Sequence, residues 1–299
     1  MSSVFSQTEL AVIRRAYAKQ ILTLSGIADD PRLEEAIAVV PRERFLGAPP
    51  WLMSRGLRGY ETVASHDPAV LYQDVLFALA SDKGVNNGSP SLHARCLHVL
   101  SLREGARVAH IGAGTGYYTA LLAHLVGASG HVLAVEFDPV LAERARDNLA
   151  DLPNVTVVQG DGAEWPREDV DAVYVNFAVG RPAEAWIERL NLDGRLIFPL
   201  GVPQPKPSPG GGRHSLYGAG LCVTRKRDGL AVQWLGHVSF VCAEGQLAQP
   251  GEERQALQAA FEGGGMEFVR SLIWREPAPP GRCCFTGSGW ALSYDEVKD

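Results

Sequence analysis

The feature that most constrains the fold is a regular alternation between residues 105 and 201. Short apolar runs (RVAHIG, HVLAVEF, VTVVQG, DAVYVNF and RLIFPL) alternate there with amphipathic stretches of helical length such as YTALLAHLV, LAERARDNL and AEAWIERL. Strand-length runs alternating with helix-length runs are typical of βαβ units, whose parallel sheet is covered by helices on both faces. We therefore predict an α/β fold with a central, mostly parallel sheet in this region.

The segments on either side have different patterns. Residues 1–100 indicate helices separated by loops, with apolar Leu10, Ile13 and Tyr17 at helical spacing and Asp30-Pro31 as a helix start. After residue 214, the apolar runs LYGAGLCVT and VQWLGHVSFVC flank the charged turn TRKRDG, which predicts an antiparallel hairpin. Between the sheet region and the hairpin, VPQPKPSPGGGR (202–213) predicts a surface loop or a lid.

The chain of 299 residues is long enough for one large domain or two small ones. We predict a main domain over residues 1–245, with its glycine-rich core at 105–201, and a C-terminal extension over 246–299. The extension contains one helical pattern, ERQALQAAFEGG, and two strand-like pieces, EFVRSLIW and GWALSY. About 50 residues are too few for an independent core, so we expect the extension to pack on the main domain.

Composition excludes several functional classes. The net charge of −6, without any basic run, argues against nucleic acid or an anionic membrane as partner. No stretch approaches the roughly 20 apolar residues of a membrane helix, and the N-terminus lacks the order of a signal peptide. The five cysteines form no C-x-x-C pair, so we predict neither a disulfide framework nor a metal site, and we expect a cytoplasmic protein.

A glycine-rich turn follows the first apolar run. Ile111-Gly112-Ala113-Gly114-Thr115-Gly116 connects this strand to a helix, so glycines allow a ligand to approach the backbone beside the helix N-terminus. The spacing is G-x-G-x-G. The dinucleotide fingerprint G-x-G-x-x-G would require a glycine where Tyr117 stands.

Acidic residues end the next two predicted strands. Glu136, followed by Phe137, can accept hydrogen bonds from both ribose hydroxyls, and Asp161-Gly162 can meet an adenine edge. Because the carboxyl ends of parallel strands share one edge of a sheet, the turn and both acids predict a nucleoside-bearing ligand. Taken alone, Glu136 could be a solvated charge and Asp161 a turn former.

This arrangement resembles the cofactor site of class I S-adenosylmethionine-dependent methyltransferases. Several segments, in the same order, resemble the protein-L-isoaspartate O-methyltransferase family: LEEAIAVVPRERFLG, LYQDVLFAL, GVNNGSPSLHARCLHVL, the glycine turn, NVTVVQGDG, LDGRLIFPLG and VSFVCAEG. The resemblance covers about residues 10–245 and implies a Rossmann-like fold that binds S-adenosyl-L-methionine and releases S-adenosyl-L-homocysteine. It assigns cofactor binding to residues 111–116, Glu136, Phe137, Asp161, Gly162 and His93.

The chain departs from the family in one loop. Family members carry G-x-T-I-S-x-P-x-M-H-A where this chain has GVNNGSPSLHA (84–94), so Asn86 and Gly88 stand at the threonine and serine positions. The resemblance implies that this loop positions the acceptor. The catalytic candidates are Asn86, Ser89 and His93, and the substrate-binding candidates are Tyr72, Asn87, Gly88 and Asn176.

Each of these assignments has a plainer alternative. Ser89 lies one position beyond the family serine, so its side chain would generally point elsewhere. His93 could be a histidine on a helix surface, Tyr72 could be ordinary core packing, and Asn176 could cap a turn. Asp74 shares the Tyr72 segment, which approaches the site in the family.

The chemistry of methyl transfer narrows the acceptor. A carboxylate, with a reference pKa of about 4, is ionised at neutral pH and needs no general base, and the chain shows no recognisable catalytic triad. We predict an O-methyltransferase for a specialised carboxylate, on a modified peptide or a small molecule. Repair of isoaspartyl sites in proteins is the main alternative. N-methylation, another O-methylation and a non-catalytic cofactor-binding protein also stay open, as does the oligomeric state.

Overall fold

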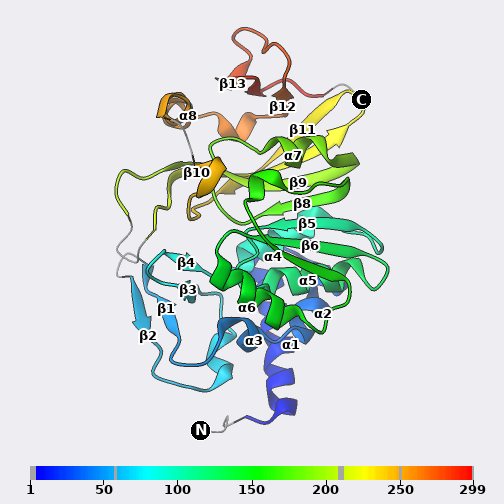
Figure 1. The fold of residues 1–299 in the computed structure, drawn as a ribbon, viewed down its shortest axis with the longest axis vertical. Helices are drawn as coiled ribbons and strands as arrows, with labels where there is room; N and C mark the ends of the chain where they lie inside the picture. Colours follow the sequence, from blue (N-terminus) through cyan, green and yellow to red (C-terminus); the bar gives the residue numbers. More distant parts are fainter. Residues whose placement is uncertain (1–4, 57–58, 208–211, 249–250, 298–299) are drawn as a thin grey trace. The chain divides into compact units, whose positions relative to one another are not determined.

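The computed structural model describes residues 5–56, 59–207, 212–248 and 251–297 (Figure 1). The chain forms two compact units that interleave along the sequence. Unit 1 comprises Met1–Arg107, Ala113–Gln159 and Ser208–Gly212, and unit 2 comprises Val108–Gly112, Gly160–Pro207 and Arg213–Asp299. The predicted boundary at residue 245 stays a prediction, and residues 208–211 of the expected loop or lid lie outside the described ranges.

Unit 1 contains the N-terminal helices, two small hairpins and a parallel strand pair. Strands β6 and β7 run parallel, with Val132 opposite Val155 and Glu136 opposite Gln159, and helices α5 and α6 pack against them. The elements are α1 (Gln7–Leu24), α2 (Pro31–Val39), α3 (Arg42–Leu46), β1 (Leu52–Ser54), β2 (Tyr60–Thr62), η2 (Pro68–Leu71), β3 (Ala78–Ala80), β4 (Val85–Asn86), α4 (Pro90–Leu100), α5 (Tyr117–Val126), β6 (His131–Glu136), α6 (Pro139–Leu149) and β7 (Val155–Gln159).

The first two helices begin at strong capping residues. A capping box between Ser6 and Glu9 starts α1. Asp30 caps α2 through a 3.0 Å hydrogen bond from the Leu33 amide, with Pro31 at the first helical position. The prediction of helices in this region is confirmed.

Unit 2 is built on one mixed sheet. Its strands follow the order β13-β14-β12-β11-β10-β9-β8-β5, in which β5, β8 and β9 are parallel and the rest antiparallel. The elements are β5 (Arg107–Ile111, of which Arg107 belongs to unit 1), η3 (Gly162–Glu164), β8 (Val170–Val175), α7 (Glu184–Glu188), β9 (Leu190–Pro203), β10 (Ser215–Lys226), β11 (Gly229–His237), η4 (Gly245–Leu247), α8 (Gly251–Gly263), η5 (Met266–Phe268), β12 (Ser271–Trp274), β13 (Cys283–Gly287) and β14 (Trp290–Ser293). The predicted hairpin is confirmed as β10 and β11, which meet at Lys226 and Gly229.

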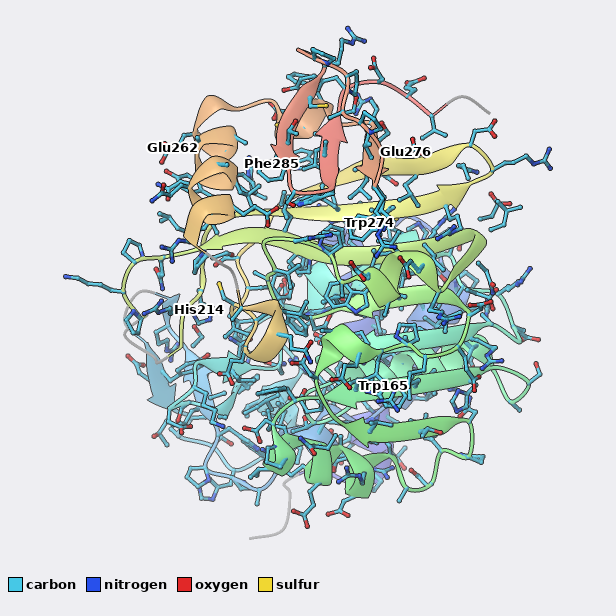
Figure 2. The ribbon with its side chains drawn as sticks, turned by 45° about the horizontal axis from the view of Figure 1, so that its top comes forward. Trp165, His214, Glu262, Trp274, Glu276 and Phe285 are labelled. Atoms are coloured by element: carbon cyan, nitrogen blue, oxygen red, sulfur yellow. The ribbon has the colours of Figure 1, made fainter. Side chains whose placement is uncertain are left out.

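The C-terminal residues extend this sheet. Strand β12 pairs with β11, β14 with β12, and β13 with β14, all antiparallel. Figure 2 labels Phe285 on β13 and Glu262 on α8, two elements that pack against each other. The ring of Phe285 lies 4.7 Å from that of buried Trp290, measured between centroids. The sequence pattern predicted α8, β12 and β14 but not β13, whose CCFTG run is short and only partly buried.

Three further expectations concern absences. Within the described ranges, no helix is long and apolar enough to cross a membrane. Among the same residues, no group of three or more His, Cys, Asp or Glu side chains could hold a metal ion. All five cysteines are free thiols. A cytoplasmic location stays a prediction.

Candidate functional site

The glycine turn of unit 1 has a backbone conformation that favours glycine. Gly114 and Gly116 have φ values of +58° and +97°, in the left-handed region that favours glycine. A Cβ on Gly116, the N-cap of α5, would lie 2.7 Å from Leu149 Cδ1. The Gly114 amide donates a 2.7 Å hydrogen bond to Glu136 Oε2. The turn and the acid at the end of β6 are therefore directly connected.

Glu136 is buried, and its environment changes its chemistry. Only 8% of the residue is exposed, and Oε1 accepts a 3.0 Å hydrogen bond from the Asp138 amide. Burial raises the pKa of Glu136 to about 7, although the amide hydrogen bonds from Asp138 and Gly114 act to lower it. The neighbouring residue Phe137 is 43% exposed. Glu136 thus changes charge near neutral pH.

The segment around Phe45 packs against the glycine turn and binds it through a hydrogen bond. Thr115 Oγ1 donates a 2.7 Å hydrogen bond to the Phe45 carbonyl, and Asn148 Nδ2 donates a 2.9 Å hydrogen bond to the Thr115 carbonyl. The rings of Phe45 and Tyr117 meet edge to face, 5.6 Å apart. Phe45 belongs to LEEAIAVVPRERFLG (33–47), one of the segments that resemble the family, and its contact with the turn was not predicted.

Two asparagines give the loop between β4 and α4 its shape. Asn86 Oδ1 accepts a 2.9 Å hydrogen bond from the Gly88 amide. Asn87 exchanges two hydrogen bonds with Phe77: its amide donates to the Phe77 carbonyl at 3.0 Å, and its Oδ1 accepts from the Phe77 amide at 2.6 Å. Both side-chain oxygens therefore accept from backbone amides, that of Asn86 within the loop and that of Asn87 from Phe77, just before β3.

Ser89 starts helix α4 and is tied to Asp74. Its hydroxyl caps the helix by accepting from the Leu92 amide at 3.5 Å and donates to Asp74 Oδ1 at 3.3 Å. The same carboxylate accepts from the Ser91 amide at 2.9 Å and from its hydroxyl at 2.5 Å. Asp74 thereby anchors the first turn of α4, and the Ser89 hydroxyl takes part in that anchor. A catalytic role of Ser89 stays a prediction.

His93 is buried rather than on the helix surface. Only 2% of it is exposed, and its ring stacks on Tyr118 with centroids 3.8 Å apart and planes 14° apart. Tyr118 lies in the first turn of α5, directly after the glycine turn. The stack therefore joins the loop of residues 84–94 to the cofactor candidates Ala113–Gly116.

Tyr72 is a packed side chain with a polar tip. Its hydroxyl donates to the Glu43 carboxylate, and its ring meets Tyr17 edge to face at 5.5 Å. Burial, followed by the hydrogen bond and charge of Glu43, raises the pKa of Tyr72. Buried Arg42 fixes the backbone on either side by donating to the carbonyls of Leu71 at 2.7 Å and Gln73 at 2.8 Å. This matches the packing alternative, and contact with a substrate stays a prediction.

In unit 2, Asp161 binds the start of the C-terminal region. Its Oδ1 accepts from the Ala163 amide and its Oδ2 from the Gln246 amide, both at 2.9 Å. The Gln246 side chain also donates to Glu164 Oε1 at 3.0 Å. Sequence reasoning did not identify Gln246, because no local pattern connects positions 85 residues apart.

Phe177 closes the space between two predicted cofactor residues. Gly112 has a φ of +78°, and a Cβ there would lie 2.6 Å from Phe177 Cδ1. A Cβ on Gly162 would lie 3.5 Å from Phe177 Cζ and would overlap Ile111 Cγ2. Close packing therefore requires glycine at both positions. The sequence predicted turns there but not this packing.

Asn176 pairs with a buried histidine. Its Nδ2 lies 2.7 Å from His110 Nε2, and burial lowers the pKa of His110 to about 3, so the imidazole is neutral and its Nε2 accepts. Asn176 Oδ1 is buried without a hydrogen-bond partner among the residues that the structure describes. Substrate binding by Asn176 stays a prediction, with this oxygen as its acceptor atom.

The comparisons with known proteins point in one direction. The family model described as "Protein-L-isoaspartate(D-aspartate) O-methyltransferase (PCMT)" matches residues 18–207. A protein-L-isoaspartate O-methyltransferase of Ignicoccus hospitalis is 32% identical over 183 residues, covering 60% of this chain and 78% of that protein. The chain spans 56% and 65% of two further curated relatives of the same description.

Solved structures share the fold. A protein-L-isoaspartate O-methyltransferase structure aligns with a TM-score of 0.61 at 24% identity, covering 87% of this chain and 72% of that one. A candidate member from Plasmodium falciparum, in complex with S-adenosyl-L-homocysteine, aligns with a TM-score of 0.58 at 18% identity, covering 77% and 98%. The predicted Rossmann-like methyltransferase fold is confirmed.

Proposed function

The chain belongs to the protein-L-isoaspartate(D-aspartate) O-methyltransferase family, and we propose that it transfers a methyl group from S-adenosyl-L-methionine to the isoaspartyl carboxylate of proteins or peptides. The observation that carries the proposal is the hydrogen bond from the Gly114 amide to Glu136. It holds a carboxyl group with a pKa of about 7 beside the glycine turn. The relatives support the acceptor, because they are named for isoaspartate methylation.

The residues present fit the cofactor. Gly114 and Gly116 leave a backbone cradle that a Cβ would strain, since both have positive φ. Glu136 can accept hydrogen bonds from the ribose hydroxyls when it is ionised. In unit 2, Asp161 and the Gly162 backbone offer polar groups for an adenine edge. The bound cofactor supplies an activated methyl group on its sulfonium.

The chain's own residues bind and orient the cofactor and the acceptor, and they need not remove a proton from the acceptor carboxylate. An isoaspartyl carboxylate has a reference pKa of about 4, so it is ionised at neutral pH and needs no general base. The loop of residues 84–94, fixed by Asp74, Asn86 and Asn87, orients the acceptor. Holding the reacting atoms in line is the main contribution that such a site makes to the rate.

The acceptor distinguishes this proposal from our sequence-based prediction of a specialised carboxylate. That prediction depended on the loop departures at Asn86 and Gly88. The comparisons favour the isoaspartyl alternative, because the family and the relatives carry that description.

Two measurements test the proposal. Titration calorimetry with S-adenosyl-L-homocysteine tests the cofactor, and transfer of a labelled methyl group to an isoaspartyl peptide tests the acceptor, with the ordinary aspartyl peptide as control. We expect binding, and turnover on the isoaspartyl peptide alone. Binding without turnover would exclude the isoaspartyl acceptor and return the specialised carboxylate to first place. An absence of binding would exclude a methyltransferase of this kind.

A further inference from the structure

Gln246 ties the start of the C-terminal region to the short helix η3 in unit 2. Its backbone amide donates a 2.9 Å hydrogen bond to Asp161 Oδ2, and its side-chain amide donates a 3.0 Å hydrogen bond to Glu164 Oε1. Asp161 caps η3 and Glu164 is its last residue, so one residue binds both ends of this helix. The elements η3 and η4 also pack against each other.

The Asp161 carboxylate is held through both of its oxygens. Oδ1 accepts from the Ala163 amide at 2.9 Å, and Oδ2 accepts from the Gln246 amide at the same distance. Two fixed donors on opposite oxygens set the plane of the carboxylate. Each carboxylate oxygen can accept two hydrogen bonds, so each keeps a position for a donor on a ligand. Asp161 is partly exposed, and a ligand can therefore reach it.

The helix itself is placed by other contacts. The buried Trp186 side chain donates a 2.9 Å hydrogen bond from Nε1 to the Gly162 carbonyl. A Cβ on Gly162 would overlap Ile111, so this residue lies tightly against β5. Loss of the Gln246 amide would therefore free the Asp161 carboxylate to rotate while η3 keeps its place. The effect of Gln246 is thus on the orientation of one carboxylate.

Gln246 lies beyond the residues that the family model matches. That match ends at residue 207, whereas Gln246 belongs to η4, which follows the hairpin of β10 and β11. The hydrogen bond spans 85 residues of sequence and uses a backbone donor, so no side-chain type marks it in the sequence. The Asp161 carboxylate is therefore oriented by a part of the chain outside the matched region.

We propose that Gln246 is a positioning residue for the adenine of the cofactor, with its backbone amide fixing the Asp161 carboxylate that accepts from the 6-amino group. The inference rests on the proposed function, which assigns Asp161 to the adenine edge. A carboxylate that is already oriented loses less conformational freedom when the amino group binds, so the hydrogen bond contributes more to affinity. The C-terminal region thereby completes the nucleoside part of the site in unit 2.

The experiment compares two ligands across a set of variants by titration calorimetry. The ligands are S-adenosyl-L-homocysteine and its 6-deamino analogue, in which a hydrogen atom replaces the amino group. Gln246→Pro removes the backbone N–H, and Gln246→Ala keeps it while removing the side-chain bond to Glu164. Asp161→Ala, alone and combined with Gln246→Pro, completes a double-mutant cycle.

We expect the wild-type protein and Gln246→Ala to prefer the adenosyl ligand by at least about tenfold in Kd, as for a hydrogen bond to a charged acceptor. Gln246→Pro should reduce this preference to below about threefold, with the Kd of the deamino analogue within about twofold of wild type. Asp161→Ala should have no preference, and adding Gln246→Pro to it should change neither Kd. A Gln246→Pro variant that keeps the wild-type preference, or that weakens both ligands equally, would overturn the inference.

A second measurement covers the case in which Gln246→Pro does not fold. In the wild-type protein, hydrogen exchange of the Gln246 amide should slow at least about fivefold more with the adenosyl ligand than with the deamino analogue, both at saturation. The reason is that only the amino group holds Asp161 against this amide. Equal protection by the two ligands would overturn the inference.

The outcomes also separate this inference from the proposed function. If the wild-type protein binds neither ligand, the cofactor assignment fails and the inference fails with it. If the wild-type protein prefers the adenosyl ligand and Gln246→Pro does so equally, only the role of Gln246 is contradicted. A failure to methylate the isoaspartyl peptide contradicts the acceptor and leaves these Kd measurements unaffected.

Discussion

The charge of Glu136 should control cofactor affinity between pH 6 and 8. Burial raises the pKa of this carboxyl to about 7, and only the ionised form can accept hydrogen bonds from both ribose hydroxyls with full strength. Affinity for S-adenosyl-L-homocysteine should therefore fall as the pH falls through 7, because the proton must leave Glu136 on binding.

The magnitude follows from this pKa. The apparent Kd is multiplied by one plus the ratio of protonated to ionised Glu136, which is about 11 at pH 6 and about 1.1 at pH 8 for a pKa of 7. The affinity should thus weaken about tenfold from pH 8 to pH 6, or about 1.4 kcal/mol. At pH 6, binding should release about 0.9 proton per molecule.

Titration calorimetry in two buffers of different ionisation enthalpy measures both quantities. Glu136→Gln cannot ionise, so its affinity should be lower at pH 8, by about 2 to 3 kcal/mol for the weakened charge-assisted hydrogen bonds, and flat over this range. Glu61→Gln, which removes an exposed carboxylate, should keep the wild-type profile. A flat wild-type profile, or an unchanged slope in Glu136→Gln, would refute the reasoning.

Three further predictions concern stability, each measured by urea unfolding. The pKa of His110 is lowered to about 3, so the unfolded state takes up a proton that the folded state does not as the pH falls below 6.5; the free energy of unfolding should drop by about 2 kcal/mol at pH 5, and His110→Gln should remove that slope. Thr115→Val should cost about 1–2 kcal/mol, because the Phe45 carbonyl loses its buried donor; an unchanged midpoint would contradict this. Gln246→Pro removes the amide that donates to Asp161 and should cost about 1–2 kcal/mol more than Gln246→Ala, which keeps it; equal losses would show that this hydrogen bond contributes nothing.

Local sequence patterns predicted most of the fold. Apolar runs of strand length and amphipathic stretches of helical length correspond to β5–β9 and α5–α6, since burial of one face needs the same periodicity wherever the element lies. Capping at Asp30 also followed from adjacent residues. Strand β13 was missed, because its pairing with β14 depends on a partner strand more than on its own pattern.

In the candidate site, too, some features follow from local sequence and others only from tertiary contacts. The glycine turn and the acid at Glu136 are local features, so the sequence by itself was enough to predict a nucleoside site there. Only the tertiary structure decided the pKa of Glu136, the anchoring of α4 by Asp74 and the closeness of the His93 ring to Gly88, where a Cβ would overlap it. These features depend on the packed chain. Asp74 meets Ser89 across 15 residues of sequence, and the His93 ring is placed by its stack on Tyr118. In the sequence, Gly88 at the family serine position looks like the loss of a hydroxyl. In the folded protein, the His93 ring occupies the space where a side chain at position 88 would begin.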